Sequence, residues 1–263
     1  MANPTDLSSV QRDYIKENFP EIMLTKSPKD VFEVINGIFY VAETGCQWNM
    51  LPRSYPSWRT CYNFFRKWTD AGIFAKSPGS MPAVARRRLG WKPHATVIVV
   101  DGQSVRSGLH QSEKGIDGGK KIKGIKRHVC VDSQGLPMNV AITRANVHDS
   151  NAAYGLICNT ILKYQDIKLI KADNGYRGRL VELLKETLDI TLECVKSNFG
   201  TSEFKPISGR WVVERTFAWL DNFGRLCRNY EKYLQTAQGM TFIGCGMFLL
   251  RFFIWIHNSV IPL

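Results

Sequence analysis

The sequence lacks the cysteine spacing on which disulfide frameworks and structural zinc sites depend. Its seven cysteines include no C-x-x-C pair, and their number is odd. Evenly paired cysteines at regular spacings mark small secreted scaffolds and zinc-binding folds. We therefore expect free cysteines that pack as small hydrophobic side chains in a reduced compartment.

Long apolar runs are scarce as well. The first twenty residues contain no apolar segment of the kind that a secretion signal requires. The one membrane-like stretch, residues 240–263, is interrupted by Arg251 and His257. A membrane span needs about 20 apolar residues with few charges. We predict a buried C-terminal helix and no membrane partner.

Acidic residues are outnumbered by basic ones. The 263 residues include 35 Lys and Arg against 23 Asp and Glu, which gives a formal net charge of +12. Hydrophobic residues make up 44% of the chain, too many for a disordered basic tail. A folded chain with this charge predicts a polyanionic partner, and nucleic acid is favoured over an anionic membrane surface. No phosphate-binding or dinucleotide-binding glycine motif indicates the use of ATP.

Residues 1–76 are predicted to form a small all-α domain. Apolar residues recur at helical spacing in DVFEVINGIFYVAET, and Gly45 ends that helix. Ser57 is placed to cap a second helix, in which basic residues stand among aromatic ones. This pattern favours a helix-turn-helix-like reader of DNA; the alternative is a helical hairpin whose aromatic side chains belong to the core. The basic residues expected to contact DNA are Arg59, Arg66 and Lys67.

Residues 77–93 are predicted to be an exposed basic linker. The segment SPGSMPAVARRRLGWKP combines proline and glycine with the triplet Arg86, Arg87 and Arg88. Proline and glycine favour irregular backbone, and a run of like charges favours solvent. A solvated charge run and a DNA contact are equally compatible with the triplet.

Residues 94–263 show the pattern of an α/β domain with a C-terminal helix. ATVIVVDG indicates a buried strand that ends at its aspartate, and a hairpin is expected around residues 133–135. Helices and strands then alternate, which predicts one mixed five-stranded sheet flanked by helices. The segment 210–234 is predicted to be a single long helix.

Two aspartates follow predicted strands. Asp101 comes after TVIVV and Asp173 after IKLIKA, and functional groups gather beyond strand ends in open α/β sheets. Glu214, among apolar residues of the last predicted helix, is expected to reach the same edge. Three convergent carboxylates suit Mg²⁺ or Mn²⁺, and two such ions catalyse phosphodiester displacement. Taken singly, the aspartates are also typical of turn caps, and Glu214 of an ion pair with Arg210 or Arg215.

A glycine-rich basic loop between predicted strands is the second candidate site. Its cations predict a track for the phosphate backbone of DNA, with a solvated loop as the alternative. These cations are Lys120, Lys121, Lys123, Lys126 and Arg127. We expect His128 and Asp132 to be structural. Asp149 is expected to cap a helix, with an auxiliary metal ligand as its alternative.

Three segments resemble the acidic motifs of bacterial insertion-sequence transposases of the DDE class, most closely those of the fifth insertion-sequence family. They are VVDGQSV, IKADNGYRG and RWVVERTFAWLDNFGRLCRNYE. Two more segments resemble the same family, namely GCQWNMLPRSYPSWRTCYNFFRKWTDAGIF and KGIKRHVCVDSQGLPMNVAITRANVHDS. The likeness spans roughly residues 30–252, so that we expect a full-length chain.

The resemblance implies an RNase H-like catalytic domain in which Asp101, Asp173 and Glu214 bind two Mg²⁺ or Mn²⁺ ions. It implies a transposase that cuts DNA and transfers strands at the terminal inverted repeats of an insertion sequence. The implied partners are the inverted repeats, the target DNA and at least one further copy of the chain, at the nucleoid of the bacterial cytoplasm. By the same resemblance, Arg210 contacts a phosphate near the cut.

Two positions near Glu214 depart from the family's pattern. Ile207 stands where a tyrosine is expected, three positions before Arg210, and Asp221 stands where a basic residue is expected. These departures bear on the DNA-end contacts and leave the three acids in place. Two alternative functions remain open: a nuclease on the same fold without strand transfer, and an inactive DNA-binding regulator derived from a transposase.

Overall fold

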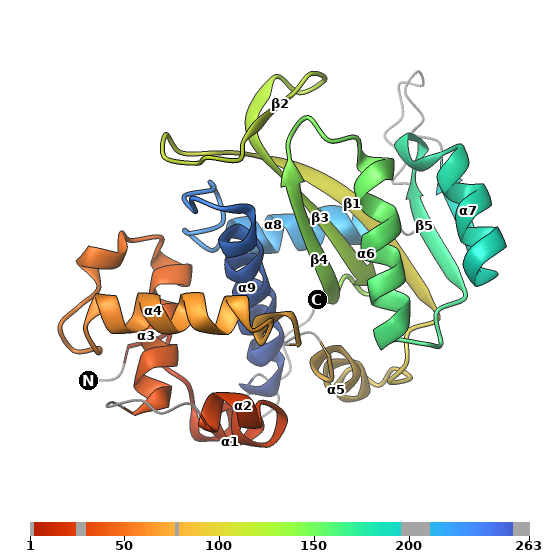
Figure 1. Cartoon of the computed structure of the whole chain (residues 1–263). Coiled ribbons are helices and arrows are strands. Elements are labelled where there is room, and N and C mark those ends of the chain that lie inside the picture. Colours follow the sequence, from red (N-terminus) through yellow and green to blue (C-terminus); the bar gives the residue numbers. More distant parts are fainter. Residues whose placement is uncertain (1–2, 25–29, 77–78, 196–210, 255–263) are drawn as a thin grey trace.

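The computed structural model describes residues 3–24, 30–76, 79–195 and 211–254. Six strands form one mixed sheet with helices on both faces (Figure 1). The strands are β1 (Val97–Arg106), β2 (Gly115–Asp117), β3 (Ile122–Asp132), β4 (Pro137–Arg144), β5 (Leu169–Asp173) and β6 (Thr191–Val195). The α-helices are α1 (Ser9–Asn18), α2 (Pro20–Met23), α3 (Val31–Thr44), α4 (Trp58–Asp70), α5 (Met81–Arg88), α6 (Asp149–Lys163), α7 (Arg179–Leu188), α8 (Trp211–Asp221) and α9 (Leu234–Ile254). Short 3-10 turns are η1 (Trp48–Met50), η2 (Phe74–Lys76) and η3 (Asn174–Tyr176).

The sheet is antiparallel on one side of β1 and parallel on the other. β1 pairs antiparallel with β3, which pairs antiparallel with β4, whereas β5 and β6 follow β1 in parallel. The α/β class and the mixed sheet are therefore confirmed, with the short strand β2 added to the five strands expected. β1 does not end at Asp101, as the sequence predicted, because its pairing with β3 continues to Arg106.

The N-terminal helices form where the sequence predicts them. The Asp30 side chain accepts a hydrogen bond from the amide of Phe32 at the start of α3, and Gly45 ends that helix in the left-handed region, at φ 71°. The Ser57 hydroxyl accepts from the amide of Thr60 at the start of α4. The connection between α3 and α4 spans residues 45–57 and contains η1. It is far longer than the three- or four-residue turn of a helix-turn-helix motif, so only the helical character is confirmed.

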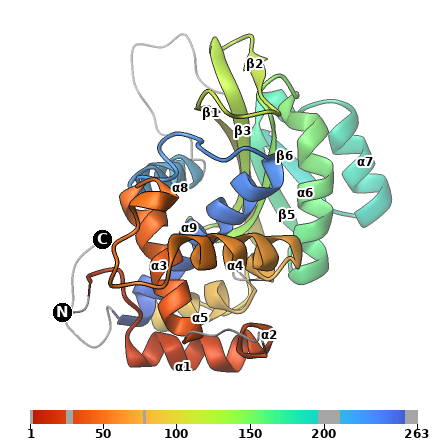
Figure 2. The ribbon, with the colours of Figure 1, turned by 60° about the vertical axis from the view of Figure 1, so that its left-hand side comes forward.

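α9 lies between the N-terminal helices and the sheet (Figures 1 and 2). Its buried side chains share one hydrophobic core with α1, α3 and α4 on one side and with β1, β3 and β4 on the other. The predicted N-terminal region therefore has no core separate from that of the sheet. No helix in the described part of the chain is long and apolar enough to cross a membrane.

The predicted linker contains a helix, α5, that is fastened to the sheet. The Arg86 guanidinium forms a buried ion pair with Asp132 at the end of β3, with side chains 7% and 0% exposed, and its Nε donates to the carbonyl of Lys92 over 2.7 Å. The prediction of an exposed linker was wrong for this segment. A buried carboxylate needs a cation, and Arg86 supplies it; Arg87 and Arg88 remain exposed.

The predicted long helix of residues 210–234 is broken after Asp221. The chain turns at Gly224, whose amide donates to the carbonyl of Glu43, and Arg225 donates to that of Ala42. A Cβ atom on Gly224 would lie 2.7 Å from the Thr44 carbonyl, so only glycine permits this approach. Docking against the end of α3 replaces the hydrogen bonds that a continued helix would have made.

Neighbouring arginines of α5 offer a matched test of this fold. Arg86→Ala leaves the buried Asp132 carboxylate without its cation, and we expect the free energy of unfolding to fall by about 3–5 kcal/mol. Arg87→Ala, on the exposed side, should change it by less than about 0.5 kcal/mol. Urea unfolding of both variants measures the difference. Equal effects would contradict the placement of α5 against the sheet.

Candidate active site

Asp101 and Asp173 lie level with each other on neighbouring parallel strands. Val97 pairs with Leu169 and Val99 with Lys171, and each aspartate follows two residues later on its own strand. Residues in register on adjacent parallel strands point to the same face. The edge predicted from the sequence therefore brings these two carboxylates next to each other, although Asp101 lies within β1 rather than at its end.

Alternation along β1 and β5 assigns both aspartates to the face that α8 covers. Ile98 and Val100 pack with α6 and α7, as do Ile170 and Ala172 of β5. Val99 instead packs with residues of α8 and α9. Because successive side chains of a strand point to opposite faces, Asp101 and Asp173 share the face of Val99.

Glu214 stands on the side of α8 that faces β1. Phe217 and Leu220 bury one side of this helix in the core that contains Val99. Asp221, two turns after Glu214 on the same side, accepts a hydrogen bond of 2.7 Å from Gln103 Nε2 of β1. Glu214 itself is exposed and lies at the edge of the buried side of the helix that Val213 and Phe217 form.

Tyr176 is a buried residue close enough to the two aspartates for their charges to act on it. It belongs to the turn η3, packs in the core that contains Ile98 and Val100, and is 1% exposed. Burial raises its pKa well above the ordinary value, and the negative charges of Asp101, Asp149 and Asp173 raise it further. Its hydroxyl has no hydrogen-bond partner among the described residues. A neutral phenol therefore stands beside these carboxylates, a residue that the sequence analysis missed although it lies three positions after Asp173.

The carboxylates match the donor chemistry of hard divalent cations, which take oxygen ligands. Within the described ranges, however, no three Asp, Glu, His or Cys side chains are close enough together to hold a metal ion. Asp173 also makes the turn contact considered for it, since its Oδ1 accepts a hydrogen bond of 2.8 Å from the Gly175 amide. The structure thus places two of the three residues predicted as ligands in register on neighbouring strands, with Glu214 on the helix that covers their face.

A polar cluster packs behind Asp101, on the opposite face of the sheet. Asp149 Oδ1 lies 3.1 Å from Lys126 Nζ and 3.7 Å from His128 Nδ1. A Cβ atom on Gly102 would lie 2.8 Å from that oxygen and 3.1 Å from His128 Nδ1, so a glycine after Asp101 lets the cluster reach the strand. His148, rather than Asp149, caps α6. Asp149 is therefore no cap, and it lies on the face of the sheet opposite Asp101.

The predicted DNA track divides at Lys123. Lys120, Lys121 and Lys123 are exposed around the turn between β2 and β3. Lys126 and Arg127 belong to β3 and are buried, 7% and 2% exposed, so the prediction of an exposed loop was wrong for them. Strand pairing with β1 and β4 carries both cations inside the protein, where they contact other groups of the chain.

Arg127 explains the departure at Asp221. Its Nη2 donates to the carbonyl of Leu226 over 2.9 Å, its Nη1 to Gln103 over 3.0 Å, and Asp221 lies 3.5 Å away. Burial lowers the pKa of Arg127, and the Asp221 carboxylate opposes that shift. Asp221 therefore holds α8 against β1 and β3 as the counter-ion of a buried arginine.

The N-terminal cations are also not equivalent. Arg59 and Lys67 are exposed on α4, whose opposite side packs into the core. Arg66 is partly buried and lies over the ring of Tyr233, 5.7 Å from its centre. Arg210 and Ile207 lie outside the described residues.

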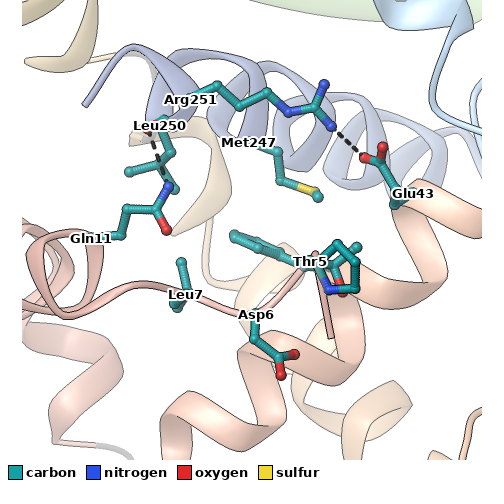
Figure 3. A pocket seen from close by; sticks show the side chains of 10 residues that line it. Thr5, Asp6, Leu7, Gln11, Glu43, Met247, Leu250 and Arg251 are labelled. Carbon is teal, nitrogen blue, oxygen red and sulfur yellow. Dashed lines mark hydrogen bonds and ion pairs between the residues drawn. The ribbon is translucent and has the colours of Figure 1, made fainter. Parts of the chain in front are cut away.

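A separate hollow of about 310 Å³ lies far from these carboxylates, where the N-terminal segment meets α3 and α9 (Figure 3). Arg251 closes one side through an ion pair of 2.7 Å with Glu43, and Gln11 Nε2 donates to the carbonyl of Leu250. These polar groups are satisfied by each other. The hollow is formed where the N-terminal segment packs on α9, and it adds no reactive group to the site that contains Asp101 and Asp173.

Comparison of the sequence with known protein families assigns this chain to one of them. The sequence pattern described as "Transposase DDE domain" matches residues 92–249, and the chain belongs to this family. A second pattern, described as "Putative transposase of IS4/5 family", matches residues 13–77. The family predicted from the three acidic motifs is confirmed.

One relative is the "Putative transposase for insertion sequence element IS402" of Burkholderia cepacia. It is 30% identical over 132 residues, which cover 46% of this chain and 61% of the relative. Among solved structures, the catalytic core of BIV integrase is 14% identical, with a TM-score of 0.35 over 56% of this chain and 81% of that one. The piggyBac transposase synaptic complex with hairpin DNA is 13% identical, with a TM-score of 0.42 over 97% and 73%. Such low scores leave the assignment to the family match.

The buried histidine behind Asp101 predicts a pH dependence of stability. Burial lowers the pKa of His128 to about 4, against an opposing effect of Asp149. Its pKa in the unfolded chain is about 6.5. Between these values the unfolded chain binds one proton more than the folded chain, so stability falls as the pH falls, by about 1.4 kcal/mol per pH unit.

Denaturant unfolding between pH 4.5 and 7.5 measures this slope in the wild type, in His128→Gln and in His110→Gln. His128→Gln should lower the slope of the free energy of unfolding against pH by the contribution of about one proton. His110→Gln, at an exposed histidine, should leave that slope unchanged. A His128→Gln slope equal to that of the wild type would show that this histidine titrates normally in the folded protein.

Proposed function

We propose that this chain is a DNA transposase, a two-metal polynucleotidyl transferase that cleaves and joins strands at the terminal inverted repeats of an insertion sequence. The observation that carries the proposal is the level placement of Asp101 and Asp173 on adjacent parallel strands, in a chain of the DDE family. Two carboxylates on one face of a sheet are otherwise costly, because like charges at short range repel each other.

Each of the three acids would have its own role in binding the catalytic ions. Asp101 and Asp173 hold the shared position on the sheet, and Glu214 completes the set from α8. When bound, Mg²⁺ or Mn²⁺ ions supply activation of the attacking oxygen and stabilisation of the leaving oxygen of a phosphodiester.

Cations outside this edge would hold the DNA. The exposed side chains of Arg59 and Lys67 on α4, and of Lys120, Lys121 and Lys123 at the β2–β3 turn, are available to phosphates. Arg66 and Arg210 remain part of this proposal, the latter beside the cut. Lys126 and Arg127 are not, because their charges are buried. Joining two transposon ends requires at least two copies of the chain on the DNA.

Variants of the acids test the catalytic proposal. Asp101→Asn, Asp173→Asn and Glu214→Gln should each lower metal-dependent cleavage of a labelled duplex carrying the DNA end that flanks this gene, by roughly 10³-fold, since several kcal/mol of charge stabilisation are lost. Binding of the uncut duplex in EDTA should persist. Asp166→Asn and Glu186→Gln, at exposed acids elsewhere, are the matched controls and should cleave normally.

Mn²⁺ binding provides a readout that is independent of turnover. Titration of free Mn²⁺ by electron paramagnetic resonance should show tight sites in the wild type and the controls, and weakened sites in the three variants. A variant that cuts at the wild-type rate removes its residue from the ligand set.

The two alternative functions give different outcomes in the same assay. A nuclease without strand transfer would cut the duplex but join nothing when a plasmid target is added. A regulator would bind the duplex and cut it in neither Mg²⁺ nor Mn²⁺. Discrete cutting followed by joined plasmid products supports the transposase.

A further inference from the structure

A hollow of about 410 Å³ lies at the C-terminal end of β1, which Arg106 forms. Five of the residues that line the hollow are basic. They are Arg106, Lys114, Lys121, Lys123 and Arg228. No acidic residue lines it. The cations come from the end of β1, the loop after it, the β2–β3 turn with the start of β3, and the connector between α8 and α9, which lie near one another in Figures 1 and 2.

Main-chain hydrogen bonds hold these segments together. The Asn229 amide donates to the carbonyl of Arg106 over 2.9 Å, and the Gly108 amide donates back to the carbonyl of Asn229 over 2.8 Å. The Ser107 amide donates to the carbonyl of Lys123 over 3.2 Å. The backbone positions from which these cations extend are therefore fixed by the fold.

No acidic side chain of the described residues pairs with the cations of the hollow. Nearby carboxylates are engaged elsewhere: Asp117 accepts from the amides of Gly119 and Lys120, Glu113 from the amide of Leu234, and Glu231 pairs with Arg225 at 2.8 Å. Five cations around one hollow repel each other, and a polyanion relieves that repulsion.

Lys121 adds an observation from the backbone. It adopts φ 53°, in the left-handed region, which is unfavourable for a residue with a Cβ and which glycine or asparagine adopts more easily. A lysine therefore occupies a turn position for which its backbone is poorly suited, and its side chain lines the hollow.

The distance to Asp101 sets where the ligand would be held. Arg106 lies five residues along β1 from Asp101, which is about 17 Å of strand. Phosphates of one DNA strand advance about 3.4 Å each along the duplex axis. The span from Asp101 to the hollow therefore matches about five nucleotides.

We propose that this hollow binds the phosphodiester backbone of the DNA end that is being cut, about five nucleotides from the phosphate at Asp101. The proposal rests on the proposed function, since it takes Asp101 as the position of the cut. It adds Arg106, Lys114 and Arg228 to the DNA contacts expected from the sequence. The DNA is assigned as the cleaved duplex because β1 leads from Asp101 to the hollow and Lys123 lies on the same face of the sheet as Asp101. Alternation along β3 puts Lys123 on the face of Val129, the residue that pairs with Asp101.

The test compares two triple variants with the same loss of charge. Arg106→Gln, Lys123→Gln and Arg228→Gln together empty the hollow of three cations. Arg87→Gln, Lys92→Gln and Lys168→Gln remove three exposed cations elsewhere. Fluorescence anisotropy in EDTA measures binding of the labelled end duplex across salt concentrations. The hollow variant should lower the salt slope by about 2.7 and weaken binding in 0.1 M salt roughly 10²-fold, and the control should change little.

A single substitution guards against misfolding. Lys121→Asn removes one cation while asparagine tolerates the left-handed backbone, so that thermal stability is kept or raised and the slope falls by about 0.9. Methylphosphonates placed one at a time along the end duplex then locate the contact. They should weaken wild-type binding about five nucleotides from the cut and leave the hollow variant unaffected there.

Each outcome decides a separate point. An unchanged salt slope in the hollow variant and in Lys121→Asn overturns the binding site. A loss confined to a plasmid-target duplex overturns the assignment to the cleaved end. A protein that cuts DNA normally with an emptied hollow rejects this inference alone, whereas one that binds through the hollow and cuts in no metal rejects the proposed function alone.

Discussion

Burial of α9 is the constraint on which the rest of the structure depends. This helix is apolar on nearly every side, and such a helix is stable in water only when it is covered all round. The sheet covers one side of it and the N-terminal helices cover the other. Gly239 lets α4 come close, since a Cβ atom there would lie 2.5 Å from Thr69 Oγ1. Helices that the sequence separates by more than 150 residues thus form one core with the strand that carries Asp101.

A second constraint is the placement of charge. Several basic residues are buried, and each of them uses a carboxylate: Arg86 with Asp132, Arg127 with Asp221, Lys126 with Asp149 and Arg225 with Glu231. Because removing either partner leaves a buried charge, these pairs tie α5, α8 and α6 to the sheet. The acidic side chains in these pairs do not neutralise basic residues on the surface of a chain that already carries more basic than acidic residues. The excess positive charge is thereby concentrated on exposed segments such as the β2–β3 turn, where a polyanion can reach it.

Local patterns predicted most of the secondary structure. Helical spacing and the residues Ser57 and Gly45 located α3 and α4, and β-branched runs located β1 and β5, because these signals act within a few residues. The errors share a different cause. α5 is a helix because Arg86 finds Asp132 in a distant strand, and α8 ends where Gly224 meets α3. Asp101 lies within β1 because β3 continues to pair with it. Contacts between distant segments decide each of these, and a single sequence does not display them.

By itself, the sequence determined the family, the two aspartates that follow apolar runs, and the excess of basic charge, since composition and short motifs carry that information. The tertiary structure alone decided which charges are available. Register between β1 and β5 sets Asp101 beside Asp173, while pairing of β3 with its neighbours buries Lys126 and Arg127, three and four residues after the exposed Lys123. Adjacent residues of a strand point to opposite faces and neighbouring strands bring remote residues together, so the same basic run supplies both internal counter-ions and surface cations.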